Sequence, residues 1–204
     1  MVKKSVPDPK RRRPAMKLFG LAGWSGSGKT TLLVKLVPEL IGRGLTVSTV
    51  KHAHHAFDLD RPGKDSFDHR AAGASEVLLT SSARWALMHE LRGAPEPEVP
   101  DLIKLMSPVD LILIEGFKRH AHEKLEVYRP SVGKPLLCTD DPSVVAVATD
   151  GSLPRVAVPI FRLDDVKGIA DFILRRVGLD STDADGMSPR MARVGAKRYG
   201  ATEG

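Results

Sequence analysis

A glycine-rich segment near the amino terminus carries the residues of a phosphate-binding loop. It reads Gly-Trp-Ser-Gly-Ser-Gly-Lys-Thr-Thr over residues 23–31 and fits the pattern Gly-x4-Gly-Lys-[Ser/Thr]. Glycine lets such a loop turn tightly and bring its backbone N–H groups close to phosphate oxygens, and a following helix adds its own unpaired N–H groups and dipole. The expected nucleotide-binding residues are Gly23, Ser25, Gly26, Ser27, Gly28, Lys29, Thr30 and Thr31.

Two side chains of this segment have the chemistry to act on a nucleotide. Lys29 would place a positive charge between the β- and γ-phosphates, and the hydroxyl of Thr30 would bind Mg²⁺. The same pattern could form an ordinary glycine-rich turn with a solvated lysine. An apolar strand before the segment and a helical pattern after it favour the phosphate loop.

A phosphate loop also needs a carboxylate at the end of a buried strand, on the metal side of the phosphates. Residues 110–116 read Asp-Leu-Ile-Leu-Ile-Glu-Gly, so Glu115 follows four apolar residues and Gly116 lets the chain turn toward the nucleotide. We therefore expect Glu115 to lie on the metal side and, together with Lys29, to carry the catalytic chemistry. A strand-terminal surface glutamate is the simpler alternative.

Residues 51–66 are rich in histidine and acidic side chains and follow a predicted strand. We expect this loop to face the phosphates, because loops at the carboxyl ends of parallel strands gather over the ligand. It could bind a transition metal through imidazole and carboxylate groups (His52, His54, His55 and Asp58). It could instead pack as an ordinary loop. We favour a switch-like segment in which an acidic residue reaches Mg²⁺ through water and a cation binds an anion (Asp58 or Asp60, and Lys64 or Arg70).

The remaining pattern alternates short apolar strands with helices, which predicts an α/β fold. Strands are expected at 18–22, 45–50, 77–79, 85–88, 110–114, 125–128 and 144–148, and helices at 28–41, 66–74, 102–106 and 166–177. Fully apolar strands such as 110–114 are typical of a mostly parallel sheet covered by helices on both faces. With the phosphate loop between the first strand and the first helix, this is the architecture of a P-loop NTPase.

The net charge of +6 suggests a nucleic-acid partner until it is apportioned along the chain. Residues 1–15 hold six cations and one anion, and residues 180–204 hold four of each, so the body is close to neutral. We expect two disordered tails, 1–15 and 180–204, around one nucleotide-binding domain at 16–179, and no nucleic-acid partner. No apolar run reaches the ~18 residues of a membrane span. The single cysteine, Cys138, suits a reducing cytoplasm.

Five segments, in order along the chain, resemble the molybdopterin-guanine dinucleotide biosynthesis adapter family (MobB). They are the phosphate loop, VKHAHHAFDLDRPGKDSFDHRAAGA at 50–74, RWALMHEL at 84–91, DLILIEGFK at 110–118 and AVATD at 146–150, and the resemblance covers residues 16–178. It implies a GTPase-like fold, GTP and Mg²⁺ binding with weak hydrolysis, a homodimer and an accessory role beside the guanylyltransferase that joins GMP to molybdopterin. Carried over by position, it places nucleotide contacts on residues 26–31 and metal-side carboxylates on Glu115 and Asp60.

Two features fall outside this pattern. No Asn-Lys-x-Asp motif is present to read guanine, and the candidates Asp150 and Asp140–Asp141 cannot be separated by spacing. No arginine is placed to act as a finger within the chain, so hydrolysis should be slow, because such an arginine is worth ~10³–10⁵ in rate. A small-molecule kinase and a metallochaperone GTPase that uses the histidine cluster are the alternative functions. Molybdopterin and other cofactor-synthesis enzymes are further candidate partners.

Overall fold

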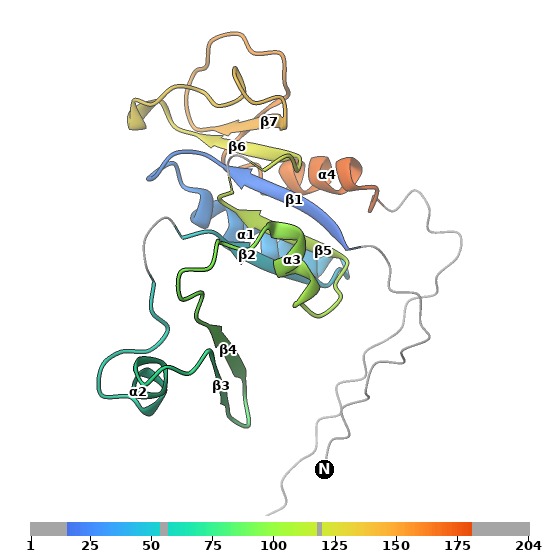
Figure 1. Cartoon of the computed structure of the whole chain (residues 1–204). Helices are drawn as coiled ribbons and strands as arrows, with labels where there is room; N and C mark the ends of the chain where they lie inside the picture. The colour runs from blue at the N-terminus through green and yellow to red at the C-terminus, as the bar shows by residue number, and fades with distance from the viewer. Residues whose placement is uncertain (1–15, 54–56, 118–119, 181–204) are drawn as a thin grey trace, which may run out of the picture.

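The computed structural model describes residues 16–53, 57–117 and 120–180 of the 204-residue chain. Its centre is a six-stranded sheet in the order β2-β5-β1-β6-β7-β8, in which every neighbouring pair is parallel (Figure 1). The strands are β1 (Lys17–Ala22), β2 (Val47–Lys51), β5 (Leu111–Glu115), β6 (Lys124–Tyr128), β7 (Val144–Thr149) and β8 (Ile160–Arg162). The predicted α/β fold with a mostly parallel sheet is confirmed, and β8 is an additional strand that the sequence did not indicate.

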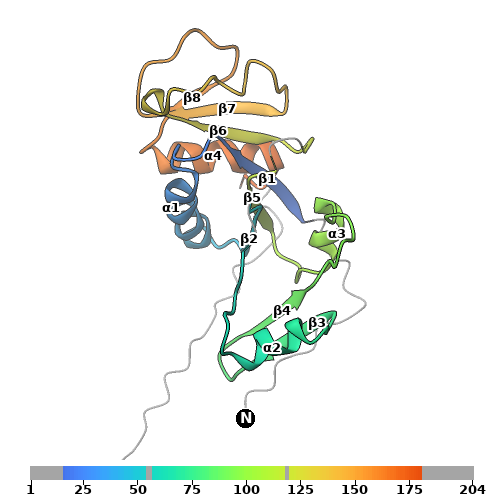
Figure 2. The ribbon, with the colours of Figure 1, turned by 60° about the vertical axis from the view of Figure 1, so that its left-hand side comes forward.

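Helices cover both faces of this sheet, as predicted. α1 (Lys29–Gly42) and α4 (Val166–Val177) pack together on one face (Figure 2), where Phe19, Leu36 and Ile173 are fully buried in the main core. The short α3 (Val99–Lys104) covers the other face through Val99, which packs against alternate residues of β5. β5 therefore contributes side chains to both cores, which explains its uninterrupted apolar sequence.

α3 begins earlier than the sequence pattern predicted. The apolar residues suggested a helix over 102–106, whereas α3 starts at Val99 with Pro100 in its first turn. Proline is favoured at that position because the first helical N–H groups have no intrahelical partner. The loop before α3 ends at Glu98, which lines a cavity together with His52 after β2 and Phe117 after β5.

A small unit projects from one edge of the main sheet (Figures 1 and 2). It consists of α2 (Asp65–Ala71) and an antiparallel pair, β3 (Glu76–Thr80) and β4 (Trp85–His89), which has no ladder to the six-stranded sheet. The segment 66–74 was predicted as a helix and the two strands as strands, but their separation from the main sheet was not foreseen. A short 3-10 turn, η1 (Pro130–Val132), follows β6.

Several predictions fall on residues outside this description. The two expected tails lie almost wholly in residues 1–15 and 181–204, and His54 and His55 belong to the undescribed residues 54–56. Within the described residues, no helix is both long and apolar enough to cross a membrane.

Candidate functional site

The glycine-rich segment forms a loop between the end of β1 and the start of α1, as the sequence predicted. Gly26 and Gly28 adopt φ values of 81° and 97°, in the left-handed region that favours glycine. Gly28 is the residue that precedes α1, and its lack of a side chain leaves the first N–H groups of the helix without a side-chain cap. These N–H groups and the helix dipole are the elements of an anion site.

Contacts within the loop fix its shape. The Nζ of Lys29 donates a 2.9 Å hydrogen bond to the carbonyl oxygen of Trp24, so the amine is folded back over the loop. Ser27 is 2% exposed, and its hydroxyl lies beneath Gly23, where an added Cβ would come within 2.7 Å of it. The loop therefore packs tightly on its inner side while Gly26 faces open space.

The carboxylate predicted on the metal side does meet the loop. Thr30 Oγ1 donates a 2.8 Å hydrogen bond to Glu115 Oε1 at the end of β5, and the Nζ of Lys51 on β2 lies 3.7 Å from the same oxygen. The side chain of Glu115 is buried, and its second oxygen, Oε2, has no hydrogen-bond partner among the described residues. A buried carboxylate oxygen without a partner is costly, and a hydrated Mg²⁺ beside Thr30 would satisfy it. The donor set fits the predicted metal.

A glycine turn carries the chain away from this carboxylate. Gly116 has a φ of 99°, and a Cβ at this position would lie 2.9 Å from the Cβ of His52. The loops after β2 and β5 are thus in direct contact, and the backbone N–H of His52 donates to the carbonyl of Glu115. The start of the histidine-rich loop, at His52, therefore lies beside the end of β5.

On the Gly28 side, a cavity of about 620 Å³ opens between α1 and the carboxyl ends of β7 and β8. Asp150, which directly follows β7, lies in its wall together with Arg129, which directly follows β6. Arg129 Nε lies 3.4 Å from Asp150 Oδ2. The other lining residues are Gly28, Thr31, Leu32, Lys35, Thr149, Gly151, Ser152, Ile160, Phe161, Arg162, Leu163 and Asp164.

The geometry separates the two guanine-reading candidates. Asp150 lies in the cavity that Thr31 and Gly28 also line. Asp140 and Asp141 line a different cavity, of about 1000 Å³, which adjoins Trp24 at the opposite end of the loop. Asp141 also pairs with the buried Lys124 at 3.2 Å and accepts from Ser143, contacts that hold the pKa of Asp141 below its ordinary value against the opposing effect of burial.

The acidic residue predicted to assist Glu115 is placed elsewhere. Asp60 and Arg70 form an ion pair at the base of the projecting unit, and Arg70 also pairs with Asp58 at 3.1 Å and Glu90 at 2.8 Å. The hydrogen bonds to Glu90 and Asp60 raise the pKa of Arg70. The structure therefore does not bring Asp60 together with Thr30 and Glu115, and it commits Arg70 to internal carboxylates instead of an external anion.

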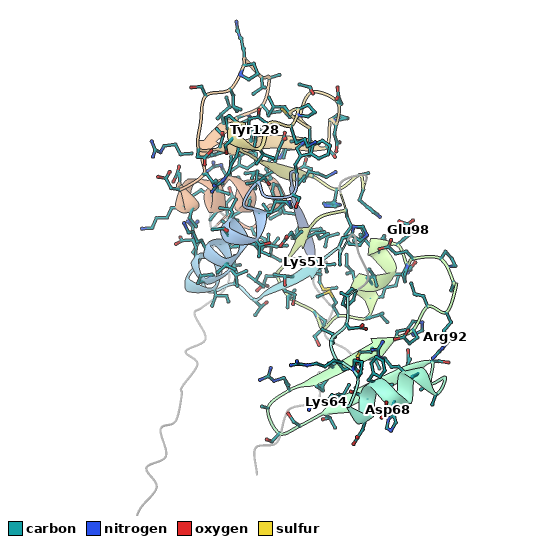
Figure 3. All side chains as sticks on the ribbon, turned by 90° about the vertical axis from the view of Figure 1, so that its left-hand side faces the viewer. Lys51, Lys64, Asp68, Arg92, Glu98 and Tyr128 are labelled. Carbon is teal, nitrogen blue, oxygen red and sulfur yellow. The ribbon has the colours of Figure 1, made fainter. Side chains whose placement is uncertain are left out.

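Lys64 also belongs to the projecting unit, at the start of α2. Figure 3 places it beside Asp68, well apart from Lys51 on the main sheet. Of the histidines considered for a metal, His52 pairs with Glu96 at 3.0 Å. Among the described residues, no group of three or more histidine, cysteine or acidic side chains is arranged to hold a metal ion.

Sequence reasoning missed Arg129, although one signal for it was available. A Cβ added to Gly28 would lie 3.4 Å from the Arg129 guanidinium, so this side chain covers the start of α1. Arg129 comes directly after a predicted strand, at the edge of the sheet where ligands gather. The strand before it, β6, lies next to β1 in the sheet, and this neighbour relation could not be derived from spacing alone.

Comparisons with known proteins agree with this architecture. The sequence profile of the family described as "Molybdopterin guanine dinucleotide synthesis protein B" (MobB) matches residues 18–150. The "Molybdopterin-guanine dinucleotide biosynthesis adapter protein" of Escherichia coli is 43% identical over 160 residues, which is 77% of this chain and 91% of that protein. The protein of the same description from Haemophilus influenzae is 42% identical over 159 residues, covering 76% and 86%.

A solved structure shares the fold. The crystal structure of Bacillus subtilis MobB matches with a TM-score of 0.62 at 22% identity and covers 79% of this chain and 98% of that one. The family profile spans more than half of the chain, and the two bacterial relatives are matched over most of their length. The chain belongs to the MobB family.

Proposed function

We propose that this protein is an adapter in the biosynthesis of molybdopterin-guanine dinucleotide that binds GTP with Mg²⁺ and assists the guanylyltransferase. The observation that carries the proposal is the contact between Thr30 and Glu115, which joins the phosphate loop to a buried carboxylate with one unsatisfied oxygen. Two relatives that are more than 40% identical are described as adapter proteins of this biosynthesis. A single cysteine, Cys138, suits work in the reducing cytoplasm.

The phosphates would lie along the loop from Gly23 to Thr31. Backbone N–H groups of Gly26 and Gly28 and the first turn of α1 would donate to phosphate oxygens, and Lys29 would exchange its contact with the Trp24 carbonyl for the β- and γ-phosphates. Bound Mg²⁺ neutralises charge on the β- and γ-phosphate oxygens. Thr30 would hold the metal directly, and Glu115 would hold one of its waters.

The base would lie in the cavity beside Gly28. The Asp150 carboxylate can accept hydrogen bonds from the N1–H and 2-amino groups of guanine, donors that the corresponding edge of adenine lacks. Arg129 already lies beside Asp150, so its guanidinium would orient that carboxylate toward the base. A site built to accept from guanine rejects adenine because the carboxylate would then be left without its partners. This arrangement supports a preference for GTP.

Hydrolysis by the protein alone would be weak. Lys29 and the metal site can stabilise charge on the γ-phosphate, but Arg129 lies at Gly28, the end of the loop where the base and ribose would bind, and Arg162 lines the same cavity. In the part of the chain that the structure describes, no arginine lines the cavity at the Trp24 end of the loop, and an arginine at the γ-phosphate is the largest single contribution to GTPase rate. Slow turnover suits a protein that holds GTP for a partner.

A homodimer would cover the outer face of the projecting unit. Leu78, Trp85 and Leu87 are 61%, 65% and 46% exposed on one face of the β3–β4 pair, where Leu78 lies opposite Leu87. An isolated two-stranded sheet is marginally stable in water, and an exposed apolar face of this kind marks an interaction surface. A second copy of the chain presents the same face and would bury all three side chains.

The direct test is a reconstituted reaction with the guanylyltransferase, molybdopterin and GTP. Adding this protein should raise the yield of the dinucleotide several-fold, and the Lys29→Ala variant should not. Lys104→Ala, which alters a surface lysine of α3 paired with Asp101, is the matched control and should act like the natural protein. No stimulation by the natural protein would contradict the adapter role, and transfer of labelled γ-phosphate to the pterin would instead establish a kinase.

A further inference from the structure

The second cavity lies at the end of the phosphate loop that the GTP base does not use. It has a volume of about 1000 Å³, and Trp24 of the loop and Phe117, two residues after Glu115, are both in its wall. In a phosphate loop the lysine reaches the β- and γ-phosphates, and Lys29 here contacts the Trp24 carbonyl. The cavity therefore adjoins the γ-phosphate end, whereas the cavity of Asp150 adjoins the opposite end.

Flat rings form part of its wall. The ring centroids of His52 and Phe117 are 4.5 Å apart with the planes tilted by 34°, and His120 meets the Phe117 ring edge-on at 5.8 Å. Trp24 Nε1 donates a 2.8 Å hydrogen bond to the carbonyl of Pro135, which holds the indole against the segment 135–141. Such rings present stacking surfaces for a planar heterocycle.

Carboxylates make up most of the polar lining. Glu96 pairs with His52 at 3.0 Å, Glu98 pairs with His120 at 2.8 Å, and Asp141 pairs with Lys124. The fourth, Asp140, is exposed and has no ion-pair partner within the described part of the chain. An ionised carboxylate only accepts hydrogen bonds and can take two adjacent donors at once. The lining thus suits a ring that carries neighbouring N–H groups.

A buried glutamate holds this wall in place. Glu126 on β6 is fully buried, and its carboxylate accepts from the backbone N–H groups of Leu137 at 2.9 and 3.0 Å and of Cys138 at 3.0 Å. Leu137 is itself a lining residue, and Asp140 and Asp141 donate their backbone N–H groups to its carbonyl. Asp140 and Asp141 are therefore anchored to the central sheet before any ligand arrives.

We infer that this cavity binds the ring of a pterin, whose 2-amino and N3–H groups donate to Asp140 while its face stacks on Phe117 or Trp24. The inference rests on the proposed function, because it identifies the second ligand of the same site. The Nζ of Lys134 lies 5.9 Å from the centre of the Trp24 ring, so a cation is present at this edge for the phosphate that molybdopterin carries. GTP and pterin then occupy opposite ends of one loop.

Guanine presents the same pair of donors as pterin, a ring N–H beside a 2-amino group, so the experiment saturates the nucleotide site first. Pterin and lumazine, which differs by having an oxo group in place of the 2-amino group, are titrated by calorimetry into the full chain with excess GTP and Mg²⁺. Pterin should bind at least tenfold more tightly than lumazine. Equal affinities, no pterin binding at millimolar concentration, or displacement of pterin by GTP would each overturn the inference.

Variants locate the binding. Asp140→Asn should weaken pterin binding tenfold or more, because the side-chain NH₂ of asparagine would face one of the two N–H groups of the pterin. Phe117→Leu should weaken pterin binding through lost stacking. Asp101→Asn on α3 alters an exposed carboxylate outside the cavity and is the matched control. Each variant should keep the GTP affinity of the natural protein, which verifies its fold. Unchanged pterin affinity in both cavity variants would overturn the assignment.

The two proposals fail separately in this design. GTP binding without pterin binding overturns the pterin site and leaves the nucleotide site intact. Pterin binding without GTP binding overturns the proposed nucleotide function alone.

Discussion

The hydroxyl of Thr30 donates a 2.8 Å hydrogen bond to Glu115, a residue 85 positions later in the chain. The two meet because β1 and β5 are neighbours in the sheet, with Leu21 in register with Glu115. The loop after β1 and the end of β5 therefore converge on one point. A metal ligand and a water-holding carboxylate at that point are what a nucleotide–Mg²⁺ complex requires.

Glu115→Gln should separate binding from hydrolysis. The amide keeps the size and one acceptor of the side chain but loses the charge that orients a metal-bound water, so hydrolysis should fall by about tenfold or more. GTP affinity should change little, because Lys29 and the loop N–H groups are untouched. Single-turnover hydrolysis and calorimetry measure the two effects, and Glu76→Gln on β3 is the control. Unchanged hydrolysis would show that Glu115 does not act on the metal side.

Lys29→Ala should remove GTP binding. The substitution deletes the charge on the β- and γ-phosphates, and the loss should reach about 100-fold or more, since hydrogen bonds to charged groups are worth ~1.5–3 kcal/mol each. Retention of the natural affinity in a calorimetric titration would contradict the phosphate-loop assignment. Lys104→Ala, far from the loop on α3, should bind GTP normally.

Charge on the projecting unit should dissociate the proposed dimer. Leu78→Glu and Leu87→Glu place carboxylates opposite each other on the exposed face of β3 and β4, where two copies would bring four together. Light scattering with size-exclusion chromatography should report a dimer for the natural chain and a monomer for the double variant. Leu105→Glu, at a still more exposed leucine beside α3, should stay dimeric. A monomeric natural chain would contradict the proposal.

Acid should destabilise the fold through His122. Burial and the neighbouring charges of Lys124 and His120 lower the pKa of His122 from 6.5 to about 4. Its ring lies against β1, where a Cβ at Gly20 would come within 2.5 Å of Nε2. The unfolded chain therefore binds this proton more readily, and stability present above pH 6.5 is lost as the pH falls toward 4. The shift sets an upper limit of about 3 kcal/mol.

Urea unfolding at pH 7 and pH 5 measures this effect. His122→Phe should flatten the dependence of the unfolding free energy on pH between these values, whereas His89→Gln, at an exposed histidine of β4, should not. An equal pH dependence in the natural protein and in His122→Phe would contradict the assignment to His122.

Local signals predicted the parts of the site that lie within one segment. The glycine spacing at 23–31 is typical of a phosphate loop, and a carboxylate after an apolar run, as at Glu115, is typical of its metal side. The segment 23–31 connects β1 to α1 and Glu115 lies at the end of β5, as expected. Our proposal of Asp150 in preference to Asp140–Asp141 needed the strand order, since β7 joins the sheet beside β6 and so brings Asp150 to the cavity at Gly28.

The contacts made by the projecting unit were not predictable. Asp60 was expected near Mg²⁺, but α2 carries Arg70 back to it, and that contact depends on how the projecting unit folds. The separation of β3 and β4 from the main sheet was not predictable either, because a short apolar strand has the same sequence pattern in either sheet. β8, at three residues, was too short to show a pattern.

The most direct test of the account is a calorimetric comparison of GTP and ATP, each with Mg²⁺, on the natural protein and on Asp150→Asn. We expect the natural protein to bind GTP at least tenfold more tightly than ATP, because only guanine donates two hydrogen bonds to a carboxylate. Asp150→Asn should lose most of this preference while ATP affinity stays the same. Equal binding of GTP and ATP by the natural protein, or no binding of either, would contradict the account.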